Sequence, residues 1–139
     1  MRIVWAIPCG WARPSSTPGR LDLFDCQIDS VLLGFLGTEV EFDVAFRLAG
    51  SAADFAVEHV VQVTLSDPQL NELGALDLPV FPRVPAPFRL PGYELSAHDV
   101  ARISFRPDRE GGYDLSFALD GEPDHRNKAT IAVKLLASG

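Results

Sequence analysis

The stretch Glu39-Val40-Glu41-Phe42-Asp43-Val44-Ala45-Phe46-Arg47-Leu48 decides the fold class of this chain. Every second residue is apolar, and most of the residues between them are charged. Because the side chains of a strand point alternately to the two faces of its sheet, this period of two predicts a strand with one buried and one solvated face. The buried face would carry Val40, Phe42, Val44, Phe46 and Leu48.

The same period of two recurs along the chain, whereas a helical period is nowhere sustained for three turns. Further strands are predicted at residues 2–7, 21–28, 59–65, 100–105, 113–119 and 129–136. About seven strands is typical of a β-sandwich. We therefore predict an all-β chain, a single antiparallel β-sandwich of about seven to nine strands that forms one domain over residues 1–139. The predicted core comprises Val40, Phe42, Val44, Phe46, Val61, Val63, Leu65, Ile103, Phe105, Leu115, Phe117, Ile131 and Val133.

Three connections are rich in glycine, proline and serine and are predicted to be loops, at residues 9–19, 34–38 and 67–97. The last holds Pro79, Pro82, Pro85, Pro87 and Pro91, and this density of missing backbone donors excludes a central strand. An extended, polyproline-like connection is expected there. The glycine pair at 111 and 112 separates two alternating runs, which predicts a hairpin of 100–105 with 113–119.

Charge and hydropathy narrow the classes of partner. The formal net charge of −7 repels phosphate backbones and anionic lipid headgroups, so neither nucleic acid nor a membrane is expected as a partner. The first residues carry one positive charge and an apolar run that is too short for a signal peptide and ends at Pro8. No apolar stretch is long enough to span a bilayer. We expect a cytoplasmic location.

The chain has two cysteines, Cys9 and Cys26. If the strands around residues 3 and 23 pair across a loop at 9–20, Cys26 lies near Ile3 and Cys9 lies near Arg20. At ~3.3 Å per residue the two sulfurs would then be roughly 20 Å apart, beyond the reach of a disulfide. Two reduced, largely packed thiols are predicted.

Motifs for metal binding or catalysis are missing from the sequence. His59, His98 and His125 lack the spacing of metal ligands, and no nucleophile elbow or phosphate-binding glycine loop occurs. His59 begins an alternating run and is interpreted as a partly buried histidine bonded to backbone. The carboxylates of Glu39, Glu41 and Asp43 could bind Ca²⁺, but a solvated sheet face explains the same spacing. We predict no cofactor, no metal and no catalytic residue.

Aromatic residues in loops are the best candidates for recognition, because exposed apolar side chains mark interfaces. The candidates are Trp11 in the first loop and Phe81, Phe88 and Tyr93 in the proline-rich connection, with Arg83 beside a P-x-x-P pattern. Residues Leu78 to Tyr93 are proposed as an ordered interaction surface, since prolines lower the entropy cost of ordering. The alternative is that these side chains close the core.

Three segments together resemble a family of small, uncharacterised bacterial β-sandwich proteins, known as a domain of unknown function. They are Gly19-Arg20-Leu21-Asp22-Leu23-Phe24, Glu58-His59-Val60-Val61-Gln62-Val63-Thr64-Leu65, and Gly112-Tyr113-Asp114-Leu115-Ser116-Phe117-Ala118-Leu119 with Asp120-Gly121-Glu122 after it. The resemblance covers nearly the whole chain outside the proline-rich connection. It implies the sandwich fold and assigns no activity to any residue.

The sequence therefore favours a non-enzymatic module that binds a protein partner or a second copy of itself. A small-ligand or carbohydrate-binding sandwich, with Trp11 and Tyr93 as stacking platforms, is the alternative. An enzyme without a recognisable motif is the third reading. A contiguous apolar surface favours the first class, and a cleft with convergent polar groups beside an aromatic ring favours the second.

Overall fold

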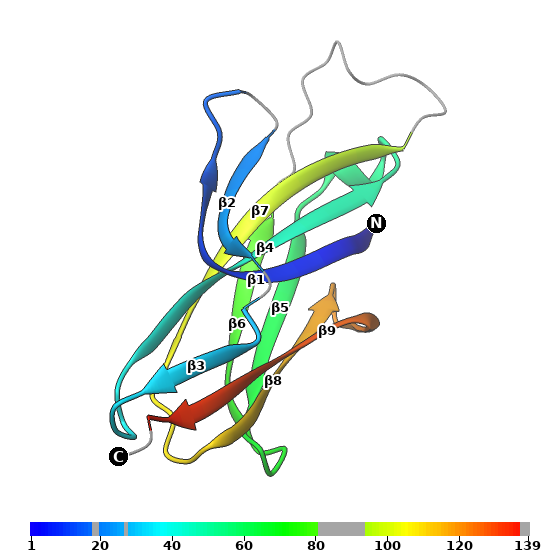
Figure 1. Cartoon of the computed structure of the whole chain (residues 1–139). Coiled ribbons are helices and arrows are strands. Elements are labelled where there is room, and N and C mark those ends of the chain that lie inside the picture. The colour runs from blue at the N-terminus through cyan, green and yellow to red at the C-terminus, as the bar shows by residue number, and fades with distance from the viewer. Residues whose placement is uncertain (18–19, 27, 81–93, 137–139) are drawn as a thin grey trace.

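The computed structural model describes residues 1–17, 20–26, 28–80 and 94–136, which form two β-sheets packed together as a sandwich (Figure 1). The prediction of an all-β chain is confirmed, and the helical content of the described residues is one short 3₁₀ turn, η1. The elements are β1 (Arg2–Pro14), β2 (Leu21–Cys26), β3 (Ser30–Leu33), β4 (Val40–Gly50), η1 (Asp54–Ala56), β5 (His59–Ser66), β6 (Glu72–Val80), β7 (Leu95–Phe105), β8 (Gly111–Leu119) and β9 (Glu122–Leu135).

The strand order is β2-β1-β4-β7 in the first sheet and β3-β9-β8-β5-β6 in the second. Neighbouring strands are antiparallel, as predicted, except that β3 runs parallel to β9, with Ser30 opposite Ala132. Strand β7 is thus an edge strand of the first sheet, and β6 is an edge strand of the second. Strand β1 of the first sheet contacts strand β9 of the second, where the Asn127 side chain donates a hydrogen bond to the Ile3 carbonyl at 3.2 Å.

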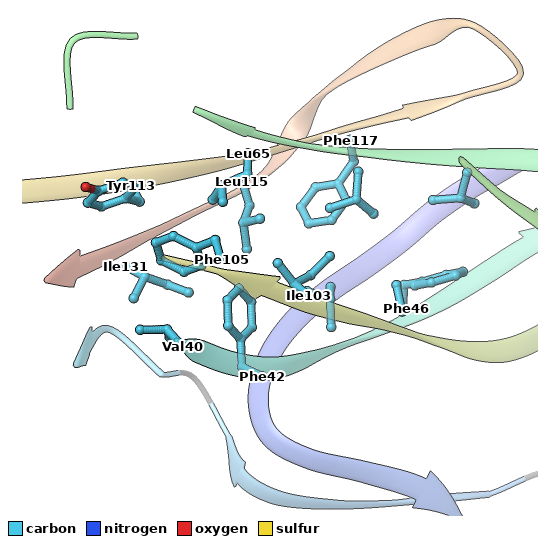
Figure 2. Packing of buried hydrophobic residues seen from close by; sticks show 14 of the residues in the cluster. Val40, Phe42, Phe46, Leu65, Ile103, Phe105, Tyr113, Leu115, Phe117 and Ile131 are labelled. Atoms are coloured by element: carbon cyan, nitrogen blue, oxygen red, sulfur yellow. The ribbon is translucent and has the colours of Figure 1, made fainter. Parts of the chain in front are cut away.

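Alternating apolar side chains fill the space between the sheets. Every residue that the sequence predicts for the core is buried there. Figure 2 shows Phe105 of β7 between Phe42 of β4 and Tyr113 of β8. The Phe42 and Phe105 rings are edge to face at 6.4 Å, and the ring centroids of Phe105 and Tyr113 are 5.1 Å apart. Tyr113 is fully buried, and its hydroxyl donates to the Arg109 carbonyl at 2.9 Å, which satisfies the one polar atom it brings into the core.

Two of the predicted loops are wrong in part, because strand pairing overrides local composition. The loop predicted at 9–19 begins only after Pro14, where β1 ends. The loop predicted at 67–97 contains the whole of β6 and the first residues of β7. Pro79 is tolerated because β6 is an edge strand, where a missing N–H can face away from the sheet.

The predicted hairpin of 100–105 with 113–119 is also wrong. Those residues belong to β7 and β8, which lie in different sheets. The hairpin partner of β8 is β9, joined through Asp120 and Gly121 with φ angles of 51° and 81°. Positive φ at both central residues is what a tight hairpin turn requires, and Asp-Gly is a strong sequence signal for it.

The hairpin of β1 and β2 folds over the outer face of the first sheet. Cys9, Ala12 and Ala45 form a second, smaller buried cluster, with Leu21 and Leu23 packed against it. The chain passes through a tight point at Gly10, where an added Cβ would meet the Cβ of Asp25 at 3.1 Å. Glycine at this position allows β1 to approach Asp25 of β2 closely. The outer surface of the hairpin remains in solvent.

The hairpin register places Cys9 directly opposite Cys26, so the separation of roughly 20 Å expected from the sequence is wrong. The error arises because β1 continues to Pro14 before β2 begins at Leu21, whereas the prediction ended the first strand before residue 9. Both thiols are free and Cys9 is buried, as predicted. Cys26 is exposed, so the prediction that it is largely packed is wrong. Burial raises the pKa of the Cys9 thiol above its ordinary value, and the negative charges of Cys26 and Asp43 add to this increase.

We expect the native protein to react with one equivalent of an aromatic disulfide reagent at neutral pH, at Cys26. Cys9 should react only after unfolding, because it is 0% exposed and its thiolate is disfavoured. A Cys26→Ser variant should show no fast thiol. Two fast thiols in the native protein would contradict the burial of Cys9, and no thiol after unfolding without reductant would reveal a disulfide across the hairpin.

Candidate functional site

The structure tests one of the five residues that the sequence proposes for recognition. Trp11 lies on β1 with 45% of its surface exposed. Phe81, Arg83, Phe88 and Tyr93 lie outside the described residues, as does the proposed interaction surface beyond Val80. Leu78 to Val80 belong to the end of β6.

Trp11 is part of a small exposed cluster on the β1–β2 hairpin. The strand register places it opposite Phe24, and the two rings stack with centroids 5.1 Å apart. The Arg13 guanidinium lies over both rings, 4.8 Å from the Trp11 centroid and 5.6 Å from that of Phe24. The partners Phe24 and Arg13 could not be identified from the sequence, because the predicted hairpin register was different.

A second exposed surface lies on the side of the sandwich between β6 and β7. β6 pairs only with β5 and β7 only with β4 among the described strands, so one edge of each strand is open. Between these edges lies a groove of about 340 Å³. Its lining is predominantly apolar and consists of Val63, Leu65, Leu73, Gly74, Ala75, Leu76, Arg102, Ile103, Ser104 and Phe105.

Leucines are exposed along this open side. Leu73 and Leu76 of β6 are 49% and 38% exposed, and Leu70 in the preceding turn is 75% exposed. Large apolar side chains on an open strand edge are unusual in a free monomer, because such an edge invites pairing with another chain. The open side is therefore the strongest candidate for a binding surface.

The turn between β5 and β6 is built to hold its shape. The buried Asp67 carboxylate accepts hydrogen bonds from the backbone N–H groups of Gln69 and Asn71 at 2.8 and 2.9 Å. These bonds, led by that of Asn71, lower the pKa of Asp67. At the tip, Leu70 has a φ of 66°, in the left-handed region that a leucine rarely occupies. The turn thus fixes an exposed leucine beside the open edge at some cost in backbone energy.

The rim of the groove is acidic. Arg102 is paired with Asp43 at 3.1 Å and lies 3.9 Å from Glu41. The Ser104 hydroxyl donates to Glu39 at 2.6 Å. The two charged residues of β6, Glu72 and Asp77, are both negative and exposed. Arg102 is the one charged residue in the lining, and it is neutralised by its pairing with Asp43. The exposed charged groups beside the groove, Glu39, Glu41, Glu72 and Asp77, are all carboxylates.

Asp43 departs from the solvated face that the sequence predicts for it with Glu39 and Glu41. It is only 4% exposed, because the β1–β2 hairpin covers it. Its carboxylate accepts the Ala12 backbone N–H at 2.8 Å in addition to the Arg102 side chain. Asp43 is thus a tether for the hairpin, and no three His, Cys, Asp or Glu side chains in the described parts of the chain are grouped to hold a metal ion.

His59 is buried and bonded to backbone, as predicted. Its Nδ1 lies 2.5 Å from the Asp120 carboxylate and its Nε2 lies 2.5 Å from the Asp54 carbonyl. Both partners are acceptors, so the arrangement favours the imidazolium form, in which both ring nitrogens donate. Burial lowers the pKa of His59, but the hydrogen bonds to Asp120 and Asp54 outweigh it and raise the pKa above its ordinary value. With both nitrogens occupied, His59 acts as a structural clamp between η1 and the β8–β9 turn.

We expect this clamp to make stability depend on pH. Because the pKa of His59 is raised on folding, its contribution is complete below the unfolded value of about 6.5 and is lost as pH rises through the folded value. The pKa of Asp120 is lowered by His59, so its contribution is present above about pH 3.9 and is lost as pH falls. Melting temperature measured from pH 5 to pH 9 should fall more steeply for the wild type than for Asp120→Asn. Asp114→Asn, on the same hairpin, should keep the wild-type slope; equal slopes for all three proteins would contradict the clamp.

A second pocket, of about 460 Å³, lies near this clamp and is lined by Met1, Arg2, Ile3, Leu119, Asp120, Glu122, Pro123, Asp124 and Arg126. It has no aromatic side chain in its lining, and Trp11 is not part of it. The convergence of polar groups beside an aromatic ring, which would favour a small-ligand site, is therefore not found at this pocket.

Comparison of the chain with family models, with curated proteins and with solved structures gave no match. The resemblance to a bacterial β-sandwich family stays a prediction. Within the described residues, no helix is long and apolar enough to cross a membrane.

Proposed function

We propose that this chain is a non-enzymatic protein-binding module and that the open side between β6 and β7 is its binding surface. The observation that supports the proposal is the apolar groove flanked by two open strand edges, with Leu73 and Leu76 exposed beside it. Burying these leucines against a partner would be favourable by about 25 cal/mol per Å² of apolar surface. The lining is mainly apolar, which suits binding better than catalysis.

The alternative of a small-ligand or carbohydrate-binding protein has less support. A sugar that stacks on Trp11 would compete with the Arg13 guanidinium, which already lies over that ring. The second platform proposed for such a ligand, Tyr93, lies outside the described residues. On the grounds of sequence given above, we further propose a bacterial protein that acts in the cytoplasm.

The proposal is tested with the double variant Leu73→Asp, Leu76→Asp. Both side chains are partly exposed, so the fold should survive, whereas a charge on the groove should prevent apolar docking. The matched control is Leu32→Asp, which is 61% exposed on β3 at the opposite edge of the same sheet. Circular dichroism and melting temperature verify that all three proteins fold.

Binding partners are measured by affinity capture from the native cells with quantitative mass spectrometry. Self-association is measured by sedimentation velocity on the purified chain. A partner or self-association present in the wild type and in Leu32→Asp but lost in the double variant is the expected result. Partners and mass that are identical in all three proteins would refute the open side as the binding surface.

A further inference from the structure

We infer that the open side binds an extended strand of another protein, which pairs with the edge of β6, is apolar at alternate positions and is flanked by lysine or arginine. This inference rests on the proposed function and names its partner class. It is carried by three separate features of the open side: backbone, groove and charge.

The backbone argument concerns the open edge of β6. Its residues pair with β5 from His59↔Val80 to Ser66↔Glu72, and the other edge has no described partner strand. An edge of this kind offers a row of N–H and C=O groups to an added strand. The segment Glu72–Asp77 is exposed throughout, so a partner strand of about six residues, roughly 20 Å long, can lie along it.

The groove argument concerns side chains. In an added strand, every second side chain points to the core side of the sheet. On that side, the groove of about 340 Å³ extends from β6 to Ile103 and Phe105 of β7, over a floor of Val63 and Leu65. Apolar side chains at alternate positions of the partner would fill it, while the others remain in solvent.

β6 is a better template than β7. The exposed apolar residues at the groove, Leu73 and Leu76, are on β6. On β7, Ile103 and Phe105 are already buried, and the long side chain of Arg102 is held by Asp43. Strand addition on β6 therefore covers more apolar surface.

The negative charge of β6 favours a basic partner strand over a second copy of this chain. Both charged residues of β6, Glu72 and Asp77, are acidic, and the chain as a whole carries −7. If two copies paired antiparallel through β6, the register that places Leu73 opposite Leu76 of the second copy would also place Glu72 opposite Asp77. Like charges opposite one another destabilise a strand pair, whereas basic residues at the ends of a partner strand would be attracted.

The test uses a labelled peptide of sequence Lys-Lys-Val-Thr-Val-Thr-Val-Lys-Lys and fluorescence anisotropy on the full chain. The matched peptides replace all lysines by glutamate, methylate the three valine amides, or methylate the two threonine amides. Amides of neighbouring residues point to opposite edges of a strand, so the valine amides share one edge and the threonine amides the other, and one of the two methylated forms removes the bonds to β6. We expect that form, the glutamate peptide, and the Leu73→Asp, Leu76→Asp protein each to weaken binding by about tenfold or more. Leu32→Asp should bind like the wild type.

Binding of both methylated peptides as tightly as the parent would overturn strand pairing. Equal binding of the lysine and glutamate peptides would overturn the basic partner. A wild-type dimer that the double variant loses would make a second copy the occupant and would also overturn the inference. If the parent peptide does not bind while a captured cellular protein still depends on Leu73 and Leu76, the inference fails and the proposed function stands.

Discussion

Phe42→Ala should lower the free energy of unfolding by about 3–5 kcal/mol, the range for removing a fully buried phenylalanine. Phe42 is 1% exposed, and its ring meets Phe105 edge to face between the two sheets. The substitution would leave a cavity in a close-packed core to which both sheets contribute. Urea denaturation followed by circular dichroism measures the change.

Phe35→Ala is the matched control, because Phe35 is 71% exposed in the turn before β4. Its effect should stay within about 0.5 kcal/mol, as for ordinary surface substitutions. A loss below roughly 1 kcal/mol for Phe42→Ala would show that the assignment of buried and exposed faces on β4 is wrong.

Asp43→Ala should cost about 2–3 kcal/mol and should release the β1–β2 hairpin. The buried carboxylate accepts the Ala12 N–H and the Arg102 side chain, and its removal leaves the Ala12 donor without a partner under the hairpin. Hydrogen exchange should therefore accelerate more in residues 9–14 and 21–26 than in β5 and β8. Denaturation gives the total cost.

Asp43→Asn separates the hydrogen bond from the charge, because its amide oxygen can still accept from Ala12. We expect it to keep most of the stability and the slow exchange of the hairpin. Equal losses for the two variants would assign the effect to the charge facing Arg102. Unchanged exchange in Asp43→Ala would show that the apolar contacts of Leu21 and Leu23 hold the hairpin without the tether.

The core could be predicted from the sequence because the period of two is a local property. From Val40 to Phe46, the position of each residue in the alternation predicts the face of the sheet to which its side chain points, whichever strand lies beside it. Pairing is not local. Nothing within residues 100–119 shows that β7 and β8 belong to different sheets, whereas the Asp120-Gly121 dipeptide is a local signal for the hairpin of β8 with β9.

The candidate site was missed for a related reason. Leu76, Leu78 and Val80 alternate with Asp77 and Pro79, which is a strand signal, but the prolines that follow dominated the prediction of a loop. A strand has an open edge when no other strand pairs with that edge. Whether this is so depends on the strand order of the whole sheet. Trp11 is exposed, as predicted, but it lies on β1 rather than in a loop, and its partners depended on a register that the sequence did not determine.

The most direct test of the open side is to map the amides that respond when the lysine-flanked peptide is added to the isotope-labelled chain. The account predicts chemical-shift changes and slower hydrogen exchange at residues 72–77 and 102–105, around the groove. Changes confined to the hairpin around Trp11, Arg13 and Phe24, with β6 unaffected, would contradict it.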